Sequence, residues 1–472
     1  MSETKIEIAT SSGLKKNRLG VIAIAFFVIA AAAPMAAFVG ASPVLFSIVG
    51  GATPLVYVIA AILVALFAVG YLKMSQSIVN AGGFVAYISK GLGNKIAAGA
   101  AGIAIFTYVT LQVGLFAQYG VFAQQLVKTL TGLDWPPLVW IVITLALVTV
   151  LTIVGVDTSL RVLGVLIALE VLVILVLLIG FVVNNGIGVF SFSSITVENL
   201  FGPGFGIALL FAFLCFTTFE ATVVFGEEAR NPRRTIPRAL YLVIAFVAVF
   251  YFLATWGTQG VVGAENIQQV ATDNPAGFIF DLATQNVGQW LNVAMQVLVV
   301  TSFIAMNLGV FNMFARYLFA LGRSGVLPKG LAKTNKKGSP SVASFVNAIL
   351  LLVILAAFLL SGADAWTVVF FWFSALGTVG FITILLVTSI SIFVFFVKTK
   401  SPGNPLVIYV APILSVIAFI YVGYLTWENF DVLSGGNPVT RYLVLLMPVL
   451  FIVGLIIGFT RPKKISFENA NV

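Results

Sequence analysis

The chain contains no histidine, and Cys215 is the single cysteine among its 472 residues. Without histidine it can form neither a serine–histidine catalytic pair nor the usual zinc sites and proton relays. A single cysteine excludes an internal disulfide bond. Charged residues are also scarce, at 9% of the chain, whereas soluble domains carry about 25%. The chain therefore does not have the composition of a soluble domain.

Apolar residues are what the chain has in abundance. Hydrophobic residues make up 60% of the sequence, and the mean hydropathy is +1.12. A membrane-spanning helix needs about 20 apolar residues. The apolar runs predict an all-α polytopic membrane protein with 12 transmembrane helices: Leu19–Ile48, Thr53–Leu72, Ile96–Val127, Leu138–Gly155, Leu160–Val183, Gly204–Gly226, Ala239–Val262, Val287–Leu321, Val342–Leu360, Trp366–Val397, Leu406–Trp427 and Tyr442–Phe459.

The distribution of basic residues fixes an orientation. With the N-terminus inside, every Lys and Arg except Lys128 and Arg441 falls on the cytoplasmic side, which predicts two cytoplasmic termini in the cell membrane. The net charge of +9 is then a topology signal with lipid-headgroup contact, and we expect no nucleic-acid partner. We also expect no cleavable signal peptide, because the first apolar run is too long and Pro34 interrupts it.

The first span cannot stay helical through its middle. Pro34 has no N–H group, and its ring clashes with the carbonyl of Ala30, but proline is well suited to the first position of a new helix. A second half-helix is therefore expected to begin at Pro34, with free N–H groups on Met35, Ala36 and Ala37 at its positive end. Such an end attracts a carboxylate. The alternative is an ordinary proline kink with small residues for helix packing.

A second span is interrupted near Thr217 and Thr218, whose hydroxyls compete for backbone hydrogen bonds, and Glu220 is an acid among aromatic residues there. Backbone groups freed at membrane depth are tolerated only where they line protein or water, so paired breaks in matching positions predict a small-molecule site. The expected site residues are Ala30, Ala31, Ala32, Ala33, Pro34, Met35, Ala36, Phe216, Thr217, Thr218, Phe219 and Glu220.

The segment after this break carries the most specific motif. Phe219-Glu220, followed by Glu227-Glu228-Ala229-Arg230-Asn231-Pro232 and the run to Ala239, resembles the segment after the discontinuous sixth helix of amino acid–polyamine–organocation (APC) transporters. The glycine-containing loop 80–93 and the segment Arg316–Pro328 resemble the same family. Thr218 stands where the family usually has glycine, and the first helix has alanines and Pro34 in place of a glycine-rich run.

This resemblance covers the chain from Leu14 to about Lys464 and implies a LeuT-type fold in one integral membrane transporter domain. Helices 1–5 and 6–10 would form two inverted repeats, with two helices appended at the C-terminus. The implied divisions are a cytoplasmic N-terminal segment 1–18, a first repeat 19–183, a second repeat 204–397, helices 11–12 at 406–459, and a cytoplasmic tail 460–472.

Two acids lie within predicted spans, where a charge costs roughly 2.5–3.5 kcal/mol and needs a reason. By resemblance, Glu170 stands where some APC members carry a lysine in a sodium-like position near helix 1. A carboxyl that is neutral in one state and ionised in another would suit proton coupling by Glu170 and Glu220. The alternatives are a structural role for Glu170 and a helix cap for Glu220. Proton is favoured over sodium because Met306–Asn312 on helix 8 lacks the paired hydroxyls that a sodium site of the implied fold generally uses; the alternative is that Glu170 itself binds a cation.

Other candidates lie around these acids. Glu227, Glu228, Arg230 and Arg233, with Arg234, could form an inner gate of ion pairs, although a solvated charged turn is the favoured explanation because exposed pairs are individually weak. Phe216 and Phe219 rank first among aromatic side chains that could shape a cavity. The remaining aromatic and amide candidates are Phe106, Tyr108, Gln112, Phe213, Trp366, Phe370, Phe371, Trp372 and Phe373.

Together these features predict a secondary active transporter that moves an amino acid across the membrane by alternating access, with proton-coupled symport. A polyamine or amine transporter and an amino acid exchanger are the alternatives. A channel would need a continuous polar stripe, and a membrane enzyme would need a nucleophile–base pair or metal ligands; neither pattern is present. We expect no catalytic residue, no metal and no cofactor, and the sequence does not indicate the oligomeric state.

Overall fold

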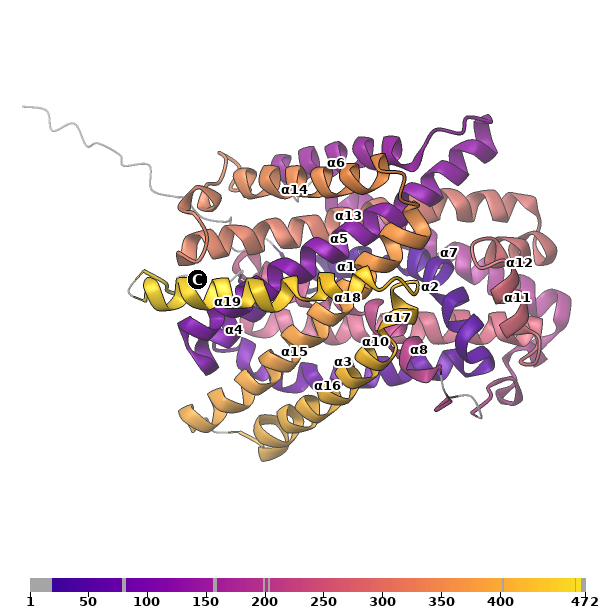
Figure 1. Cartoon of the computed structure of the whole chain (residues 1–472). Coiled ribbons are helices and arrows are strands. Elements are labelled where there is room, and N and C mark those ends of the chain that lie inside the picture. The colour runs from indigo at the N-terminus through magenta and orange to yellow at the C-terminus, as the bar shows by residue number, and fades with distance from the viewer. Residues whose placement is uncertain are drawn as a thin grey trace, which may run out of the picture.

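The computed structural model describes residues 19–78, 82–155, 159–197, 200–202, 204–400, 403–462 and 464–467. Within these residues every regular element is a helix, and a single isolated bridge joins Leu19 to Ala229. The helices lie side by side as an elongated bundle, with α6 and α14 along one edge and α16 along the other (Figure 1). The all-helical class predicted from the sequence is confirmed.

The first half of the chain contains seven α-helices. Glycine and proline mark several of their ends; for example, Gly132 follows the last residue of α5 in the left-handed conformation, and α6 starts with Pro137. The elements are α1 Val21–Ala32, α2 Pro34–Val49, a 3₁₀ turn η1 Gly50–Ala52, α3 Thr53–Ser75, α4 Gly83–Leu92, α5 Asn94–Thr131, α6 Pro137–Val154, α7 Ser159–Asn185, and two 3₁₀ turns, η3 Ile187–Phe190 and η4 Phe192–Ser194.

The second half begins with another interrupted helix and continues with long spans. Its elements are α8 Phe205–Leu214, η5 Thr217–Glu220, α9 Ala221–Val224, η6 Phe225–Glu228, α10 Pro232–Val262, α11 Ile267–Asp273, α12 Phe278–Asn286, α13 Gln289–Ser324, η7 Lys329–Ala332, α14 Ser341–Leu360, η8 Ala365–Phe370, α15 Phe371–Thr399, η9 Leu406–Val410, α16 Ala411–Glu428, α17 Phe430–Leu433, α18 Val439–Val444 and α19 Leu446–Thr460.

Eleven segments of the described chain are long and apolar enough to cross a membrane. One of them, Val21–Ser75, is 55 residues long, and a straight helix of that length would measure roughly 80 Å against a hydrocarbon core of about 30 Å. It contains α1, α2 and α3 and turns at Gly50–Ala52. Counting it as two crossings would give the predicted twelve, so the exact number stays a prediction.

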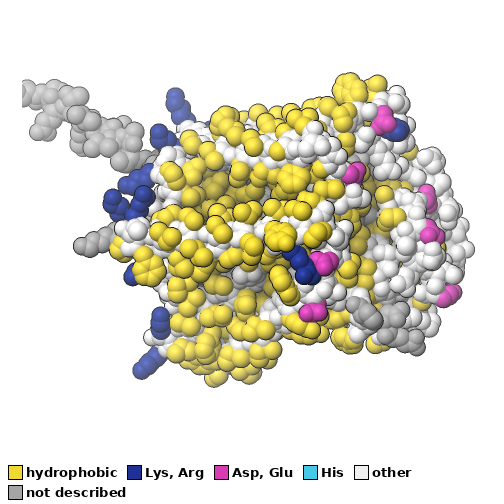
Figure 2. Space-filling view, in the orientation of Figure 1, with side chains coloured by type: hydrophobic (Ala, Val, Ile, Leu, Met, Phe, Trp, Pro, Cys, Tyr) yellow, Lys and Arg dark blue, Asp and Glu magenta, His cyan; other side chains and the backbone are white. Residues whose placement is uncertain are grey.

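The surface of the bundle has the pattern of a protein solvated by lipid. Apolar side chains are exposed along the outer helices, including Ile143 on α6, Phe345 on α14, Ile417 on α16 and Ile456 on α19. In Figure 2 these apolar side chains form a broad band, with Lys and Arg gathered at one end of the bundle and Asp and Glu toward the other. We call these the basic end and the acidic end.

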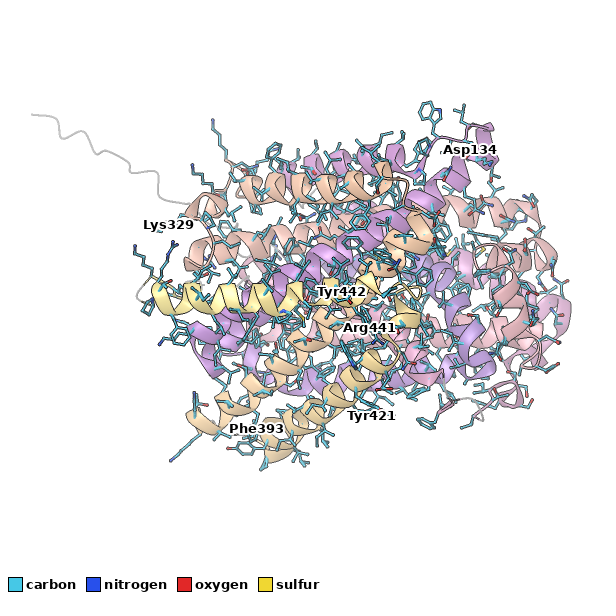
Figure 3. All side chains as sticks on the ribbon, viewed as in Figure 1. Asp134, Lys329, Phe393, Tyr421, Arg441 and Tyr442 are labelled. Carbon is cyan, nitrogen blue, oxygen red and sulfur yellow. The ribbon has the colours of Figure 1, made fainter. Side chains whose placement is uncertain are left out.

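Two basic residues depart from this segregation, and both have acidic partners. Lys128 contacts Asp134 at 2.6 Å, and Arg441 pairs with Asp431 through Nε–Oδ1 and Nη2–Oδ2 distances of 2.7 and 2.9 Å. Asp134 lies at the far end of the bundle from Lys329 (Figure 3). The hydrogen bond from the Lys128 ammonium lowers the pKa of Asp134. Lys128 and Arg441 therefore add little net positive charge to the acidic side.

Candidate functional site

The first span is interrupted at Ala33, between α1 and α2. Ala33 adopts the left-handed conformation, with φ 47° and ψ 67°, and its N–H group bonds the carbonyls of Ile29 and Ala30 at 3.0 and 3.1 Å. Pro34 then starts α2, as its fixed φ and missing N–H group favour. The expected interruption is present, and the turning residue is Ala33 rather than Pro34 itself.

The first turn of α2 differs from the expectation of free N–H groups. The Met35 N–H donates to Glu170 Oε2 at 3.2 Å, the Ala36 N–H donates to Ser302 Oγ at 3.3 Å, and the Ala37 N–H donates to the Ala33 carbonyl at 2.9 Å. Buried N–H groups without a partner are costly, so side chains from α7 and α13 supply the missing acceptors. The predicted anion-binding site at the start of α2 is therefore occupied by the carboxyl group of Glu170, a residue of this same chain.

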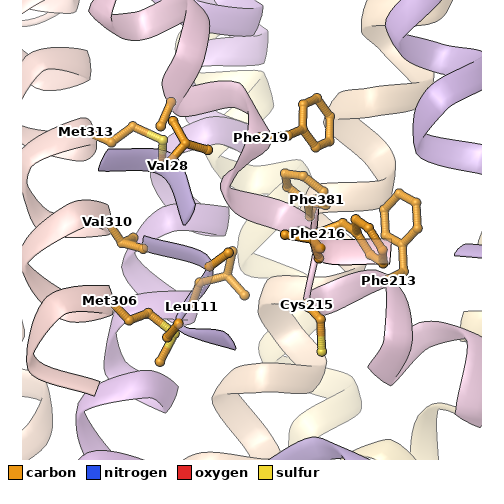
Figure 4. Close-up of a cluster of buried hydrophobic side chains, with 14 of the residues drawn as sticks. Val28, Leu111, Phe213, Cys215, Phe216, Phe219, Met306, Val310, Met313 and Phe381 are labelled. Carbon is orange, nitrogen blue, oxygen red and sulfur yellow. The ribbon is translucent and has the colours of Figure 1, made fainter. Parts of the chain in front are cut away.

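The second interruption follows α8. Cys215 and Phe216 bond back to the carbonyls of Ala212 and Phe213 with i→i−3 geometry, and the chain continues through the short segments η5, α9 and η6. A tight 3₁₀ turn is the usual local answer when an α-helix cannot continue. Figure 4 places Cys215 and Phe216 at this break, across from Met306 and Val310 on α13.

A cavity of about 90 Å³ lies where the two interruptions meet. Small side chains of α1 and α2 form one wall, and α5, α8, α13 and the α15 region form the others. Its lining is mainly apolar and contains no Lys, Arg, Asp or Glu among the residues described. The lining residues are Ala31, Ala32, Ala36, Ala37, Gly40, Ala41, Tyr108, Leu111, Leu115, Gln118, Phe211, Leu214, Cys215, Thr218, Phe303, Met306, Val310, Met313, Phe370 and Ser374.

Two polar side chains on this wall have no partner within the described chain. The hydroxyls of Tyr108 and Thr218 are buried, and neither makes a hydrogen bond there. Cys215 also lines the cavity, and its thiol donates to the Phe211 carbonyl at 3.4 Å. A buried hydroxyl normally finds a partner, so these two residues hold unused hydrogen-bonding capacity beside the cavity.

Glu220 lies away from this cavity, in a buried contact with α4. Its Oε1 accepts the Phe84 N–H at 2.8 Å, while the neighbouring Val85 N–H donates to Tyr317 Oη at 3.1 Å. The acid therefore caps the start of α4 rather than the broken helix that carries it. Acceptors at a helix N-terminus are favoured by the dipole and by the unpaired N–H groups. Gly83 permits this close approach, because its φ is +47° and no side chain would fit beside Glu220.

At the basic end the two interrupted spans are joined through their backbones. The Leu19 N–H donates to the Glu228 carbonyl at 3.1 Å, and the Arg230 N–H donates to the Leu19 carbonyl at 2.8 Å. The rings of Phe27 and Phe225 also meet, with their centroids 4.5 Å apart. The segment before α1 is thus fastened to the segment after η6.

An ion pair next to this junction departs from the predicted gate. Glu228 Oε1 contacts Arg316 Nε at 2.5 Å, and Arg316 also donates to the carbonyl and side-chain oxygen of Asn312. The Arg316 side chain is 3% exposed and lies over the ring of Phe225. The sequence did not predict that Arg316 pairs with Glu228, although an arginine inside a long apolar span was an available signal.

The other predicted gate residues are placed differently. Arg230 and Arg233 are exposed, and the side chain of Glu227 lies outside the described residues. A charged turn can face water on one side while a single acid turns inward. Among the predicted gate residues, Glu228 joins the buried network through its pair with Arg316.

Four of the predicted site residues line the cavity: Ala31, Ala32, Ala36 and Thr218. Ala30, Ala33, Pro34 and Met35 form the break beside it, Phe216 and Phe219 flank the second break, and the side chain of Thr217 lies outside the described residues. Of the aromatic candidates, Tyr108 and Phe370 reach the wall. Leu111, Gln118 and Met306 were missed, because a single sequence does not show which face of a buried helix turns toward a break.

Comparison with known proteins gives a family match over residues 19–460, to the family described as amino acid permease. The chain is 32% identical to the branched-chain amino acid permease BcaP of Lactococcus lactis over 36% of each chain. It is 30% identical to the lysine-specific permease LysP of the same organism, over 39% of this chain and 36% of that one. It is 26% identical to a probable polyamine transporter of Arabidopsis thaliana, over 26% of this chain and 24% of the other.

These pairwise matches are partial, since each aligned region spans only about a third of the length of the two bacterial relatives. The family match is nearly complete and includes both interrupted spans, the cavity between them and the Arg316–Glu228 pair. Its extent agrees with the all-helical, apolar architecture of the bundle. The chain belongs to the amino acid permease family.

Proposed function

We propose that this protein is a secondary active transporter, not an enzyme, and that it moves an amino acid or related amine across the cell membrane by alternating access. The observation that carries the proposal is the cavity at the meeting point of two interrupted spans. Interrupted helices at membrane depth are how transporters of this general type expose backbone groups to a solute. The names of the bacterial relatives support an amino acid as the solute.

The lining of the cavity has the chemistry of a small-molecule site, although its volume of about 90 Å³ is below the roughly 300–1,000 Å³ of typical ligand pockets, so a bound solute requires the site to widen. Its walls are mainly apolar, with the ends of α1, α2 and α8 around it and two hydroxyls that have no partner among the residues the structure describes. Apolar walls suit a solute with a compact hydrocarbon side chain, while hydroxyls and helix ends suit its charged groups. The solute's ammonium would meet carbonyls near Ala30, Ala31 and Phe216.

The direction of access follows from the closed basic end. The Leu19–Ala229 bridge and the Arg316–Glu228 pair close that end, while the cavity lies near the middle of α5 and α13 and beside the first two turns of α2. With both termini cytoplasmic, this arrangement corresponds to a state closed toward the cytoplasm. We assign the inner gate to Glu228 and Arg316.

For energy coupling we propose proton symport, with Glu170 as the proton carrier and Glu220 as a second acid whose contact with α4 must change when the inner end opens. Glu170 lies directly at the break between α1 and α2, where a change of protonation changes the hydrogen bonds of α2. An exchanger would use the same cavity without net proton movement, and a sodium-coupled mechanism would require the cation in place of the proton.

Reconstitution into proteoliposomes tests the proposal. Radiolabelled L-leucine, L-lysine and a diamine such as putrescine are offered with an inward proton gradient, with a sodium gradient, or with internal unlabelled solute. Accumulation of an amino acid that collapses with a protonophore supports the proposal. Uptake that needs only internal solute would identify an exchanger, and no uptake of any amino acid or amine would refute transport.

A further inference from the structure

The complete occupation of the first turn of α2 has a consequence for how the ligand binds. Pro34 has no N–H group, and the Met35, Ala36 and Ala37 N–H groups all have partners within this chain. No donor of that turn is left for a ligand carboxylate. One of the partners, Glu170, is itself a carboxylate, buried to 2% exposure.

We infer that Glu170 is a built-in competitor of the transported amino acid: its carboxylate and the carboxylate of the ligand use the same N–H group at the start of α2. This inference rests on the proposed function. The ligand carboxylate takes the Met35 N–H only after Glu170 has left it, and it takes the Ala36 N–H from the neutral hydroxyl of Ser302.

The site at this helix end is not inferred from the helix alone. Ala36 and Ala37 of the same turn line the cavity, as do Tyr108 and Thr218, whose side chains are buried at 1% and 6% residue exposure and whose hydroxyls have no partner in the described chain. A zwitterionic ligand would bind with its carboxylate at the start of α2 and its ammonium group near the hydroxyls across the narrow cavity.

Charge repulsion makes the exchange a proton-coupled step. Two carboxylates that share one site cannot both stay ionised. Glu170 therefore takes one proton from the medium to become a neutral acid, its bond to Met35 breaks, and the ligand carboxylate forms the new bond. Before binding, the site contains ionised Glu170; after binding, it contains neutral Glu170 and a zwitterionic ligand. One positive charge, the proton on Glu170, therefore enters the site with each neutral amino acid.

Few other titratable groups lie close enough to Glu170 to contribute to the pH dependence of ligand binding. α1 and α2 contain no titratable side chain. Among the described groups on the remaining elements that pack against α7, Tyr251 on α10 interacts electrostatically with Glu170, and its hydroxyl donates to the Ala32 carbonyl at 3.4 Å. On α13 the charged residues are Arg316 and Arg323, fourteen or more positions beyond Ser302, or at least about 20 Å along the helix.

The test compares L-leucine with 3-methylbutylamine, which is leucine without its carboxylate, by equilibrium binding to the purified full-length protein between pH 5 and pH 9. For the wild type, leucine affinity should fall about tenfold per pH unit once Glu170 is ionised, because one proton is taken up per ligand. The amine should show no such slope. Glu170→Gln keeps an acceptor for Met35 but cannot ionise, so its leucine affinity should be independent of pH and exceed the wild-type value at pH 9.

Ser302→Ala is the matched control. It frees the neighbouring Ala36 N–H without removing a titratable group, so leucine affinity should change while the pH slope stays the same. The inference is wrong if wild type and Glu170→Gln share one pH profile, or if the amine shows the same slope as leucine. Leucine uptake with a flat pH profile would overturn the competition while leaving the transport function intact; absence of binding and uptake for every amino acid and amine would overturn the function itself.

Discussion

The substitution Gly83→Ala tests the contact between the second interrupted span and α4. Gly83 has φ +47°, and a Cβ atom built on it would overlap Glu220 Oε1 and lie 2.6 Å from a ring carbon of Tyr317. Both neighbours are fully buried. Alanine at this position would therefore strain the backbone and force the acid away from the Phe84 N–H.

The size of the effect follows from two terms. A left-handed alanine costs about 1–2 kcal/mol, and overpacking a buried site costs about 1–3 kcal/mol, so Gly83→Ala should destabilise the protein by roughly 2–5 kcal/mol. Gly132→Ala is the matched control, since Gly132 has φ +78° at the end of α5 with no atom within 4 Å of the added Cβ. It should lose only the first term, about 1–2 kcal/mol.

The assay is the denaturation midpoint of the purified protein in detergent, followed by uptake in proteoliposomes. We expect Gly83→Ala to lower the midpoint more than Gly132→Ala and to reduce uptake, while Gly132→Ala keeps its uptake. Combining Gly83→Ala with Glu220→Ala should cost less than the sum of the two changes, because the clash with the acid is gone. Equal midpoints for the two glycine variants would refute the close contact between Gly83 and Glu220.

Three further predictions concern the gate, the cavity and the break. Arg316→Ala should destabilise the protein by about 3–5 kcal/mol, because it leaves Glu228 without its partner, and an unchanged denaturation midpoint would contradict the buried pair. Cys215, the sole thiol, should react with a small methanethiosulfonate reagent added from the acidic side, and bound ligand should slow the reaction; labelling that ignores saturating ligand would argue against the cavity as the site. Pro34→Ala restores an N–H group at the break, so initial uptake rates should fall, and wild-type rates would mean that the break does not need proline.

Hydropathy and proline placement predicted much of the fold. Apolar runs located several spans to within a few residues, as for α3 and α14, because a bilayer imposes a minimum length on each. Pro34 located the first break because its chemistry is local. The short helices α11 and α12 were not predicted; they lie between long spans, and their 7 and 9 residues are too few for a periodic pattern to stand out.

The site was predicted less completely, for a physical reason. Glu170 and Met35 are 135 residues apart, and Phe84 and Glu220 are 136 apart, so neither bond leaves a local signal. The sequence indicated that a buried acid needs a partner but not which N–H group would supply it. The prediction of free N–H groups at the start of α2 was wrong, because acceptors on α7 and α13 bond the Met35 and Ala36 N–H groups. A folded chain satisfies its buried donors from whichever helix packs nearby.

The way the basic end is closed bears on which step of a transport cycle is slow. Release of a solute there must separate Leu19 from the chain around Ala229, part the rings of Phe27 and Phe225, and expose the guanidinium of Arg316, all of which hold one another in place. Such interlocked contacts open together or not at all. We therefore expect turnover to be limited by this unfastening rather than by solute capture from the opposite compartment.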